Sequence, residues 1–182
     1  AKAHYNLGVI YKDSGELQKA KICFKKVIEI NPNEQETHNS LGIIIQEIGE
    51  YQKAKDSYKK AIEINPNYGD AYYNLGQLLH ESGEYYLAEN YLKKAIQIKP
   101  GDVRASNSLL TNLYKMNNQS ILFEELDSII NEGKMNAVIG SICSRSEVKY
   151  GIKKENPFCN NPLDYVLKKD LNEKYDFKNV II

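Results

Sequence analysis

The sequence predicts an all-α fold, a solenoid of stacked helical hairpins, and three observations lead to this prediction. The chain repeats itself with a period of 34 residues. Apolar residues within each period recur at the spacing of an α-helix. A glycine and a proline stand at fixed places in each period, where they end one helix and then the next. Stacked hairpins of this kind form a superhelix with a concave face.

The 34-residue period is strict over the first 102 residues of the chain. Each unit carries Asn/Ser-Leu-Gly near its start and Gly-Glu in its middle. An alanine and a lysine pair follow, and a proline stands close to the end of the unit. Few sequence patterns identify a repeat architecture as specifically as this. The motifs fall at 6–8, 40–42 and 74–76; 15–16, 49–50 and 83–84; Ala20, Ala54 and Ala88; 25–26, 59–60 and 93–94; and Pro32, Pro66 and Pro100.

The first helix of the first unit is predicted near residues 2–14. Leu7, Gly8 and Tyr11 lie on one face of this helix, which we expect to be its packing face. Gly8 lets a second helix come close, because it has no side chain. Gly15 supplies the positive φ angle that ends the helix.

The second helix is predicted near residues 17–30 and packs back on the first. Its packing face carries Ala20, Phe24 and Val27. Ala20 is small and is expected where the two helices cross. Pro32 cannot continue a helix, and it also disfavours helical geometry in the residue before it. The chain therefore turns here and begins the next hairpin.

These features resemble the tetratricopeptide repeat (TPR) family, with full copies at 1–34, 35–68 and 69–102. The resemblance implies that the hairpins stack into a right-handed solenoid. The large aromatic residue often found at the fourth position of the repeat is replaced by His4 and His38. We expect both histidines to be buried packing residues.

A fourth, degenerate copy is predicted at 103–136, so that the TPR solenoid would span residues 1–136. It keeps the helical pattern, but Leu110 replaces the glycine and Leu122 replaces the alanine. Asn117 and Asn118 fall at the glycine turn. Asparagine is the best substitute for glycine in a left-handed conformation, so the hairpin can still close.

The 34-residue pattern stops near residue 137, and we interpret 137–182 as a partly irregular connector or the start of a second domain. Residues 161–171 read as a short helix and 175–182 as a strand. The text of 145–166 is similar to the segment that joins TPRs to a 2-oxoglutarate/iron(II) oxygenase domain in some bacterial proteins. A bridging segment packed along the last repeat is an equally good interpretation. Because no histidine follows His80, the chain itself lacks the iron ligands of those oxygenases.

The resemblance also implies where a ligand binds, because TPR proteins hold extended peptides on the concave face formed by their first helices. The groove positions are the second, fifth, sixth, ninth and twelfth of each repeat. They make an amide-rich and aromatic surface of mixed charge. The predicted peptide-binding groove residues are Tyr5, Asn6, Val9, Lys12, Asn39, Ile43, Gln46, Tyr73, Asn74, Gln77, His80, Asn107, Thr111 and Tyr114.

One TPR subclass binds the C-terminal carboxylate of chaperones through lysine, arginine and asparagine side chains. The corresponding positions here are Tyr5, Val9, Ser40, Asp70 and Asn74. Asp70 stands where that subclass has a cation and would repel a carboxylate. The sequence therefore argues against that subclass.

A second resemblance is to the repeats of the O-linked N-acetylglucosamine transferase, in which a ladder of asparagines at the sixth position grips the peptide backbone. Asn6 and Asn74 match this ladder, while Ser40 and Ser108 do not. An amide offers both a donor and an acceptor, which suits a backbone of any sequence. The alternative is that Asn6 and Asn74 are only solvated polar residues of amphipathic helices.

Composition excludes several other classes of function. The chain has 24 basic and 24 acidic residues, which is unlike a nucleic-acid-binding protein. No apolar run is long enough to span a bilayer, so we expect no membrane partner. Cys23, Cys143 and Cys159 are widely spaced, and we interpret them as reduced thiols of a cytoplasmic protein.

No catalytic, metal-binding or cofactor-binding motif is found in the sequence, so we predict no enzymatic activity, no metal and no cofactor. The leading hypothesis is a protein–protein interaction scaffold that binds an extended peptide or partner segment in its groove. The alternative is the substrate-recruiting arm of a larger enzyme, an oxygenase first and a glycosyl- or other transferase second. A purely structural assembly role is a third hypothesis, and it predicts self-association and no measurable affinity for extended peptides.

Overall fold

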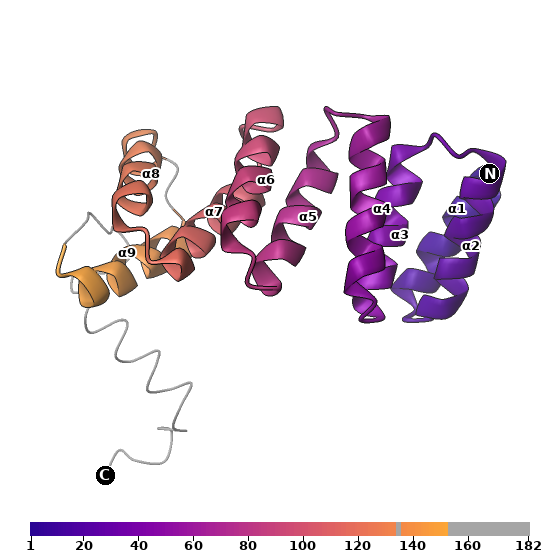
Figure 1. Cartoon of the computed structure of the whole chain (residues 1–182), viewed down its shortest axis with the longest axis horizontal. Coiled ribbons are helices and arrows are strands. Elements are labelled where there is room, and N and C mark those ends of the chain that lie inside the picture. The colour runs from indigo at the N-terminus through magenta and orange to yellow at the C-terminus, as the bar shows by residue number, and fades with distance from the viewer. Residues whose placement is uncertain (134–135, 153–182) are drawn as a thin grey trace, which may run out of the picture. The chain divides into compact units, whose positions relative to one another are not determined.

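A computed structural model describes residues 1–133 and 136–152 of the 182-residue chain. Over these residues the regular secondary structure is entirely α-helical, which confirms the predicted fold class (Figure 1). None of the described helices is long and apolar enough to cross a lipid bilayer. The helices are α1 (Lys2–Asp13), α2 (Leu17–Ile30), α3 (Gln35–Glu47), α4 (Tyr51–Ile64), α5 (Gly69–Glu81), α6 (Tyr85–Ile98), α7 (Val103–Met116), α8 (Gln119–Asn131) and α9 (Ala137–Tyr150).

The chain divides into two compact units, Ala1–Leu109 and Leu110–Ile182. The first unit contains helices α1 to α6 and the start of α7, and the second contains the rest of α7 with α8 and α9. The predicted solenoid boundary at residue 136 stays a prediction. The helix predicted at 161–171 and the strand predicted at 175–182 lie outside the described residues.

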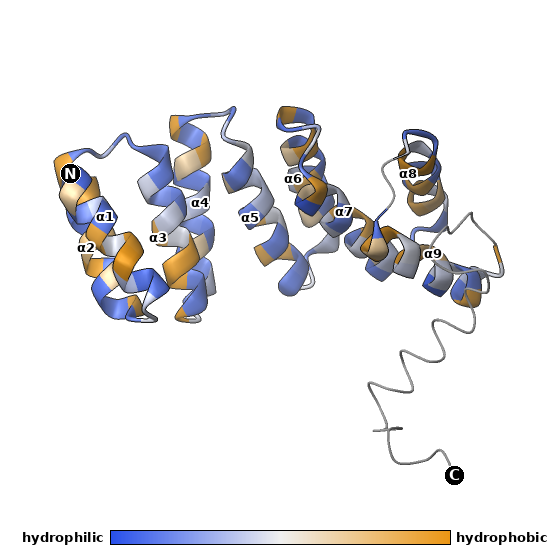
Figure 2. Cartoon of the chain, turned by 180° about the vertical axis from the view of Figure 1, so that it is seen from behind, coloured by the Kyte–Doolittle hydropathy of each residue, from blue (hydrophilic) through white to orange (hydrophobic). Residues whose placement is uncertain are grey.

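The first unit consists of the three predicted hairpins, α1/α2, α3/α4 and α5/α6, side by side in chain order (Figure 1). Helix α2 also contacts α3, α4 contacts α5, and the first helices α3 and α5 touch each other. Figure 2 shows hydrophobic and hydrophilic residues mixed along each of these helices, as expected of helices with one buried face. The crossing-point alanines Ala20, Ala54 and Ala88 are all completely buried.

The two helices of each hairpin approach so closely that the repeated glycine has no room for a side chain. A β-carbon built on Gly42 would lie 2.5 Å from the ring of Tyr58. The glycine thus faces the large residue four positions after the alanine, and that residue is almost fully buried in every case. The other two pairs are Gly8 with Phe24, at 2.9 Å, and Gly76 with Leu92, at 2.8 Å.

The positive-φ residues that end the first helices keep the 34-residue spacing after residue 102, where the sequence motifs stop. Asn117 has a φ of 59°, which confirms the left-handed turn predicted for the degenerate hairpin. Gly151 follows one period later with a φ of 71° and ends α9. Ala137 likewise follows Val103, the start of α7, by one period. Helix α9 therefore keeps the register of a first helix of the repeat, although its sequence lacks the repeat motifs.

Three predicted packing residues differ from expectation. His4 and His38 are half-buried rather than buried, and the Nε2 atom of His38 lies 2.9 Å from the carbonyl oxygen of Pro32. Leu7 is 38% exposed, whereas the equivalent Leu41 is 7% exposed. The difference arises because α3 packs on the preceding helix α2, and no described helix precedes α1.

A repeated ion pair joins neighbouring hairpins. Lys21 of α2 lies 2.5 Å from Glu50, at the start of α4, and Lys55 of α4 pairs with Glu84 in the same way one repeat later. Glu50 also pairs with Lys53 at 2.5 Å. Hydrogen bonds from Lys21 and then Lys53 lower the pKa of Glu50 to about 2.

This lowered pKa predicts a pH-dependent contribution of Glu50 to stability. A carboxylate whose pKa falls on folding stabilises the protein above its unfolded pKa, near 4.3, and loses this effect as the pH drops toward 2. We expect Glu50→Gln to lower the free energy of unfolding at pH 7 and to have little effect near pH 2. Urea denaturation across this range measures the difference. Glu29→Gln, on an exposed position of α2, is the control, and a deficit of Glu50→Gln that persists unchanged at pH 2 would contradict the assignment.

The close helix approach predicts that Gly42→Ala is destabilising. The new methyl group would overlap the Tyr58 ring, and overpacking of this kind costs about 1–3 kcal/mol, partly offset by the better helix propensity of alanine. We expect a net loss of about 1–2 kcal/mol in chemical denaturation. Gly101→Ala, in the turn between α6 and α7, is the control for adding a methyl group without overlap, because no atom lies within 4 Å of a β-carbon built there. Equal stability of the two variants would show that Tyr58 simply moves aside.

Candidate functional site

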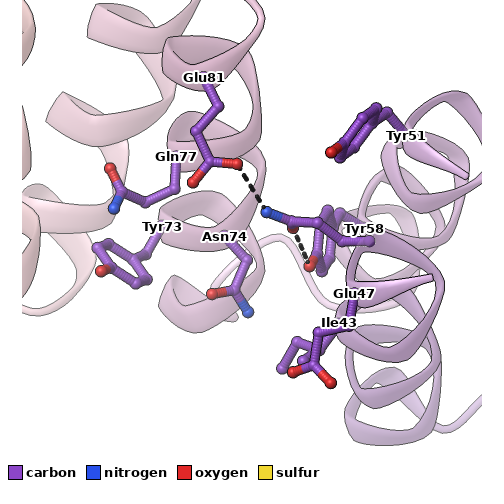
Figure 3. A pocket seen from close by; sticks show the side chains of 9 residues that line it. Ile43, Glu47, Tyr51, Tyr58, Tyr73, Asn74, Gln77 and Glu81 are labelled. Atoms are coloured by element: carbon purple, nitrogen blue, oxygen red, sulfur yellow. Dashed lines mark hydrogen bonds between the residues drawn. The ribbon is translucent and has the colours of Figure 1, made fainter. Parts of the chain in front are cut away.

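A hollow of about 520 Å³ lies between the second and third hairpins of the first unit (Figure 3). Helix α3 with Tyr51 and Tyr58 of α4 forms one side, and α5 forms the other. Five of the predicted groove residues line it, so the structure brings together the central part of the predicted site. The lining residues are Ile43, Gln46, Glu47, Tyr51, Tyr58, Tyr73, Asn74, Gln77 and Glu81.

Helical geometry explains why these side chains converge. On α5, Asn74 and Gln77 are three residues apart, and Gln77 and Glu81 are four apart, so they share one face of the helix. On α3, Gln46 lies three residues after Ile43 and occupies the facing surface. The opposite faces of both helices are used for packing within the hairpins. The outward face of each first helix therefore lines the hollow, together with Tyr51 and Tyr58 of α4.

Gln46 links the two sides of the hollow. Its Nε2 atom donates a hydrogen bond to Glu81 at 3.1 Å, and its Oε1 atom accepts one from the Tyr58 hydroxyl at 2.8 Å (Figure 3). Tyr58 is only 1% exposed. Burial, together with the charges of Glu81 and Glu47, raises the pKa of Tyr58, so this hydroxyl remains a donor. The amide of Gln46 is thus held in one orientation.

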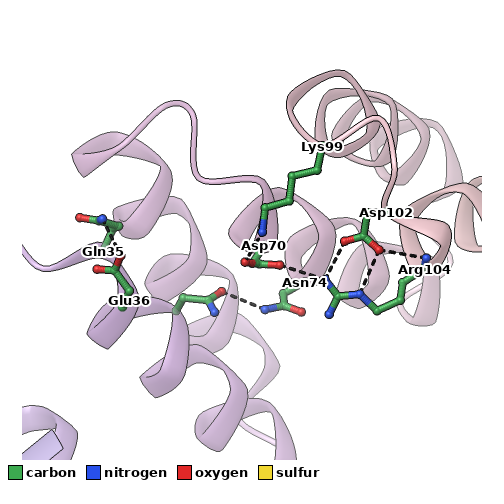
Figure 4. A network of polar contacts seen from close by, with 8 residues as sticks. Gln35, Glu36, Asp70, Asn74, Lys99, Asp102 and Arg104 are labelled. Carbon is green, nitrogen blue, oxygen red and sulfur yellow. Dashed lines mark hydrogen bonds and ion pairs between the residues drawn. The ribbon is translucent and has the colours of Figure 1, made fainter.

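A second set of polar contacts connects the first helices of neighbouring hairpins. The Nδ2 atom of Asn74 donates to Oδ1 of Asn39 at 2.9 Å (Figure 4). One repeat earlier, the hydroxyl groups of Tyr5 and Ser40 lie 3.3 Å apart. Asn39, predicted as a groove residue, is 6% exposed and does not line the hollow. It holds Asn74 in place from behind.

An ion-pair network joins the start of α5 to the segment between α6 and α7 and to the start of α7 (Figure 4). Asp70 pairs with Lys99 at 2.7 Å and with Arg104 at 3.0 Å, and Arg104 also pairs with Asp102 at 2.6 Å. Burial alone would raise the pKa of Asp70, but the hydrogen bonds from Lys99 and Arg104 hold it below its usual value. The guanidinium of Arg104 also lies 5.0 Å from the ring centre of Tyr73.

This network changes one step of the argument against a chaperone-type carboxylate site. Two cations offset the charge of Asp70, so repulsion by Asp70 is a weaker reason than the sequence suggested. Tyr5, Val9 and Ser40 still lack the cationic and amide groups of that subclass. That the chain lies outside this subclass stays a prediction from sequence.

Other predicted groove residues lie away from the hollow. Asn6 is exposed on α1, and Val9 and Lys12 are half-buried there, with Lys12 3.5 Å from Asp13. His80 lies on α5, with its ring centre 5.4 Å from that of Tyr85. Within the part of the chain that the structure describes, no group of three or more His, Cys, Asp or Glu side chains could hold a metal ion.

The last predicted groove residues fall on α7, which spans the division between the units. Asn107 is half-buried in the first unit, and Thr111 is half-buried in the second. Tyr114, also in the second unit, is contacted by α9. Lys149 donates to the Tyr114 carbonyl at 3.1 Å, and the Lys149 ammonium and Arg145 guanidinium lie 4.4 and 5.2 Å from its ring centre.

Four residues of the hollow were absent from the sequence prediction. Tyr51 and Tyr58 belong to a second helix, and the prediction took groove residues from first helices only. Glu47 and Glu81 occupy the same position in successive repeats, directly after the twelfth position. Their recurrence one period apart, at the end of each first helix, was a signal in the sequence that could have identified them.

Several solved structures share this fold. YrrB, described as a TPR protein with an unusual peptide-binding site, matches with a TM-score of 0.69 and 18% identity over 93% of this chain and 84% of that one. MamA matches with a TM-score of 0.64 and 29% identity over 74% and 81% of the two chains. The first TPR of Spaghetti (RPAP3), bound to the HSP90 peptide SRMEEVD, matches with a TM-score of 0.61 and 16% identity over 63% and 91%.

Family models of the tetratricopeptide repeat match the first part of the chain. A tetratricopeptide repeat model matches residues 1–34 and 69–102. Two further models of this repeat match 23–56 and 47–83, so that the matches together cover the first three hairpins without a gap. No curated protein matches the chain. Through residues 1–102, the chain belongs to the tetratricopeptide repeat family.

Proposed function

We propose that the first unit binds an extended segment of another polypeptide along the first helices of its hairpins, with the hollow between α3 and α5 as the central contact. The hollow is the observation that carries this proposal. It combines amide groups, aromatic rings and an aliphatic side chain in one concave surface. A few fixed polar groups on a partly apolar wall are typical of ligand-binding sites in proteins.

The amide groups on α5 are suited to a peptide backbone. Asn74 uses one N–H group on Asn39, which leaves its carbonyl oxygen and its second N–H group for a ligand. Gln77 makes no hydrogen bond to the described residues and lies one helical turn further along the hollow. Together they present donors and acceptors at two successive points of an extended chain. Recognition of this kind tolerates many peptide sequences.

The asparagine ladder predicted from the sequence takes a narrower form in this proposal. Asn74 lines the hollow, whereas Asn6 is exposed on α1 and lies outside it. We therefore place the backbone contacts on Asn74 and Gln77. Asn6 would add a contact only if the bound segment continues along α1.

The solved structures support a binding role rather than a catalytic one. The Spaghetti structure contains a bound peptide, and YrrB is described as having a peptide-binding site. Binding of a peptide to this chain needs only hydrogen bonds and apolar contact, both of which the hollow supplies. We propose that the unit recruits or assembles protein partners in this way.

A paired comparison of amide variants tests the proposal. We expect the full chain to select extended peptides from a random peptide library, and Asn74→Ala/Gln77→Ala to weaken their binding roughly tenfold or more, because each lost hydrogen bond contributes about 1 kcal/mol. The matched control is Gln52→Ala/Asn90→Ala, which removes the same two side chains from exposed positions on α4 and α6. Fluorescence polarisation measures the dissociation constants, and circular dichroism checks that both variants fold.

Two outcomes would count against this function. If the library yields no binding peptide, the first unit is not a general peptide-binding module. If the selected peptides bind both double variants as well as the parent chain, the peptides bind elsewhere and the hollow is not the site.

A further inference from the structure

We propose that the hollow between the second and third hairpins selects a cationic side chain, arginine or lysine, in the segment that it binds. This inference rests on the proposed peptide-binding function and adds the chemical class of the partner. It is carried by the charges of α3 and α5, by the placement of two carboxylates and by an open tyrosine ring.

The first helices that face the hollow, α3 and α5, carry acidic groups and no lysine or arginine. Helix α4, which contributes Tyr51 and Tyr58, carries four lysines, and none of them lines the hollow. Helix α3 contains Glu36 and Glu47, and α5 contains Asp70 and Glu81. The whole chain has equal numbers of basic and acidic residues, so this local excess is not a consequence of overall composition. An acidic concave surface attracts positively charged ligands, and the effect weakens with salt.

Three cations on neighbouring elements are already paired, and the first of them is Lys55 of α4, which pairs with Glu84. Lys99 and Arg104 lie against Asp70, and Arg104 also pairs with Asp102. Lys99, Arg104 and the two aspartates have no net charge together. None of the nine residues that line the hollow is a lysine or an arginine. No lining cation therefore offsets the two carboxylates of the hollow.

Glu47 and Glu81 come from opposite sides of the hollow (Figure 3). Glu47 is exposed at the end of α3 and forms no ion pair with the described residues. Glu81 accepts one hydrogen bond from Gln46 and retains a second oxygen. A guanidinium or ammonium group between the two helices can contact either carboxylate. Such charge-assisted hydrogen bonds are stronger than neutral ones.

Tyr51 provides an aromatic surface for the same side chain. It lines the hollow, is 55% exposed, and has no ring or cation stacked on it among the described residues. A cation over an exposed tyrosine ring gains about 0.5–1 kcal/mol. Arginine can stack its planar group on such a ring, whereas lysine contributes mainly a point charge.

The charge of the hollow disfavours acidic segments. The peptide in the Spaghetti structure, SRMEEVD, contains two glutamates and one aspartate. A glutamate placed between Glu47 and Glu81 would meet like charges on both sides, which is repulsive at short range. We therefore expect partners of this chain to differ in charge from that peptide.

Four oriented peptide libraries test this inference on the full 182-residue chain. Each has eleven residues, with a central arginine, lysine, glutamine or glutamate flanked by mixtures of uncharged residues. We expect the arginine and lysine libraries to bind about tenfold more tightly than the glutamate library, with glutamine between them. Tighter binding of arginine than of lysine would assign part of the preference to the Tyr51 ring.

Charge-neutralising variants locate the preference. We expect Glu47→Gln and Glu81→Gln each to reduce the advantage of cationic peptides about two- to fivefold, the range for one exposed ion pair. Glu29→Gln removes the same charge from an exposed position of α2 and should leave the advantage unchanged. Because Glu81 is bonded to Gln46, the Glu47→Gln variant keeps the test valid if Glu81→Gln folds poorly.

The possible failures of the two proposals are distinguishable. If all four libraries bind the parent chain equally, the charge inference is wrong and the peptide-binding function stands. If cationic libraries bind better but none of the Glu47 and Glu81 variants reduces the advantage, the preference arises elsewhere and the inference is also wrong. If no library binds, the proposed function itself fails.

Discussion

The contact between the repeated glycine and the large residue of the second helix sets the geometry of the first unit. Gly42 lies against Tyr58 so closely that even a methyl group would overlap the ring. This contact fixes the distance between α3 and α4, and therefore the position of every side chain that α3 directs outward. Tyr58 also reaches Gln46 with its hydroxyl group, so that one residue both spaces the hairpin and orients a residue of the hollow. Packing and site geometry are coupled in this hairpin through a single side chain.

Strict periodicity turns one such hairpin into an extended surface. Because each 34-residue repeat has the same length, the contacts between neighbouring hairpins recur in the same register. The pairs Lys21–Glu50 and Lys55–Glu84 are an example. Surface ion pairs contribute little individually, but a repeated pair favours one register over its alternatives. In the second unit, the start of α9 at Ala137 and the turn at Gly151 keep the 34-residue spacing although the sequence motifs are absent. The spacing of helix boundaries thus persists without the motif residues.

The sequence predicted the fold more completely than the site. Glycine and proline act on the backbone directly, so helix ends and even the turn at Asn117 could be predicted from local chemistry. Exposure depends on which helices lie next to a residue, and the repeat pattern does not contain this information. Leu7 was therefore predicted to be packed, although it is exposed. The hollow forms between hairpins and includes residues of a second helix, such as Tyr51, which a list of first-helix positions cannot contain. Asn39, in contrast, stands at a groove position and is buried.

The same backbone frame carries different chemistry in successive hairpins. Lys12 occupies in the first repeat the position that Gln46 occupies in the second, and Asp13 precedes Glu47 and Glu81 in the same series. In α1 the acidic residue therefore has a lysine beside it, 3.5 Å away, whereas in α3 and α5 its neighbour is an uncharged amide or His80. A repeat architecture keeps the position of a carboxylate constant, and the residue before it decides whether the charge is offset within the helix. The charge of this surface thus changes through substitutions at a few outward positions, while the glycine contact recurs in the first three hairpins.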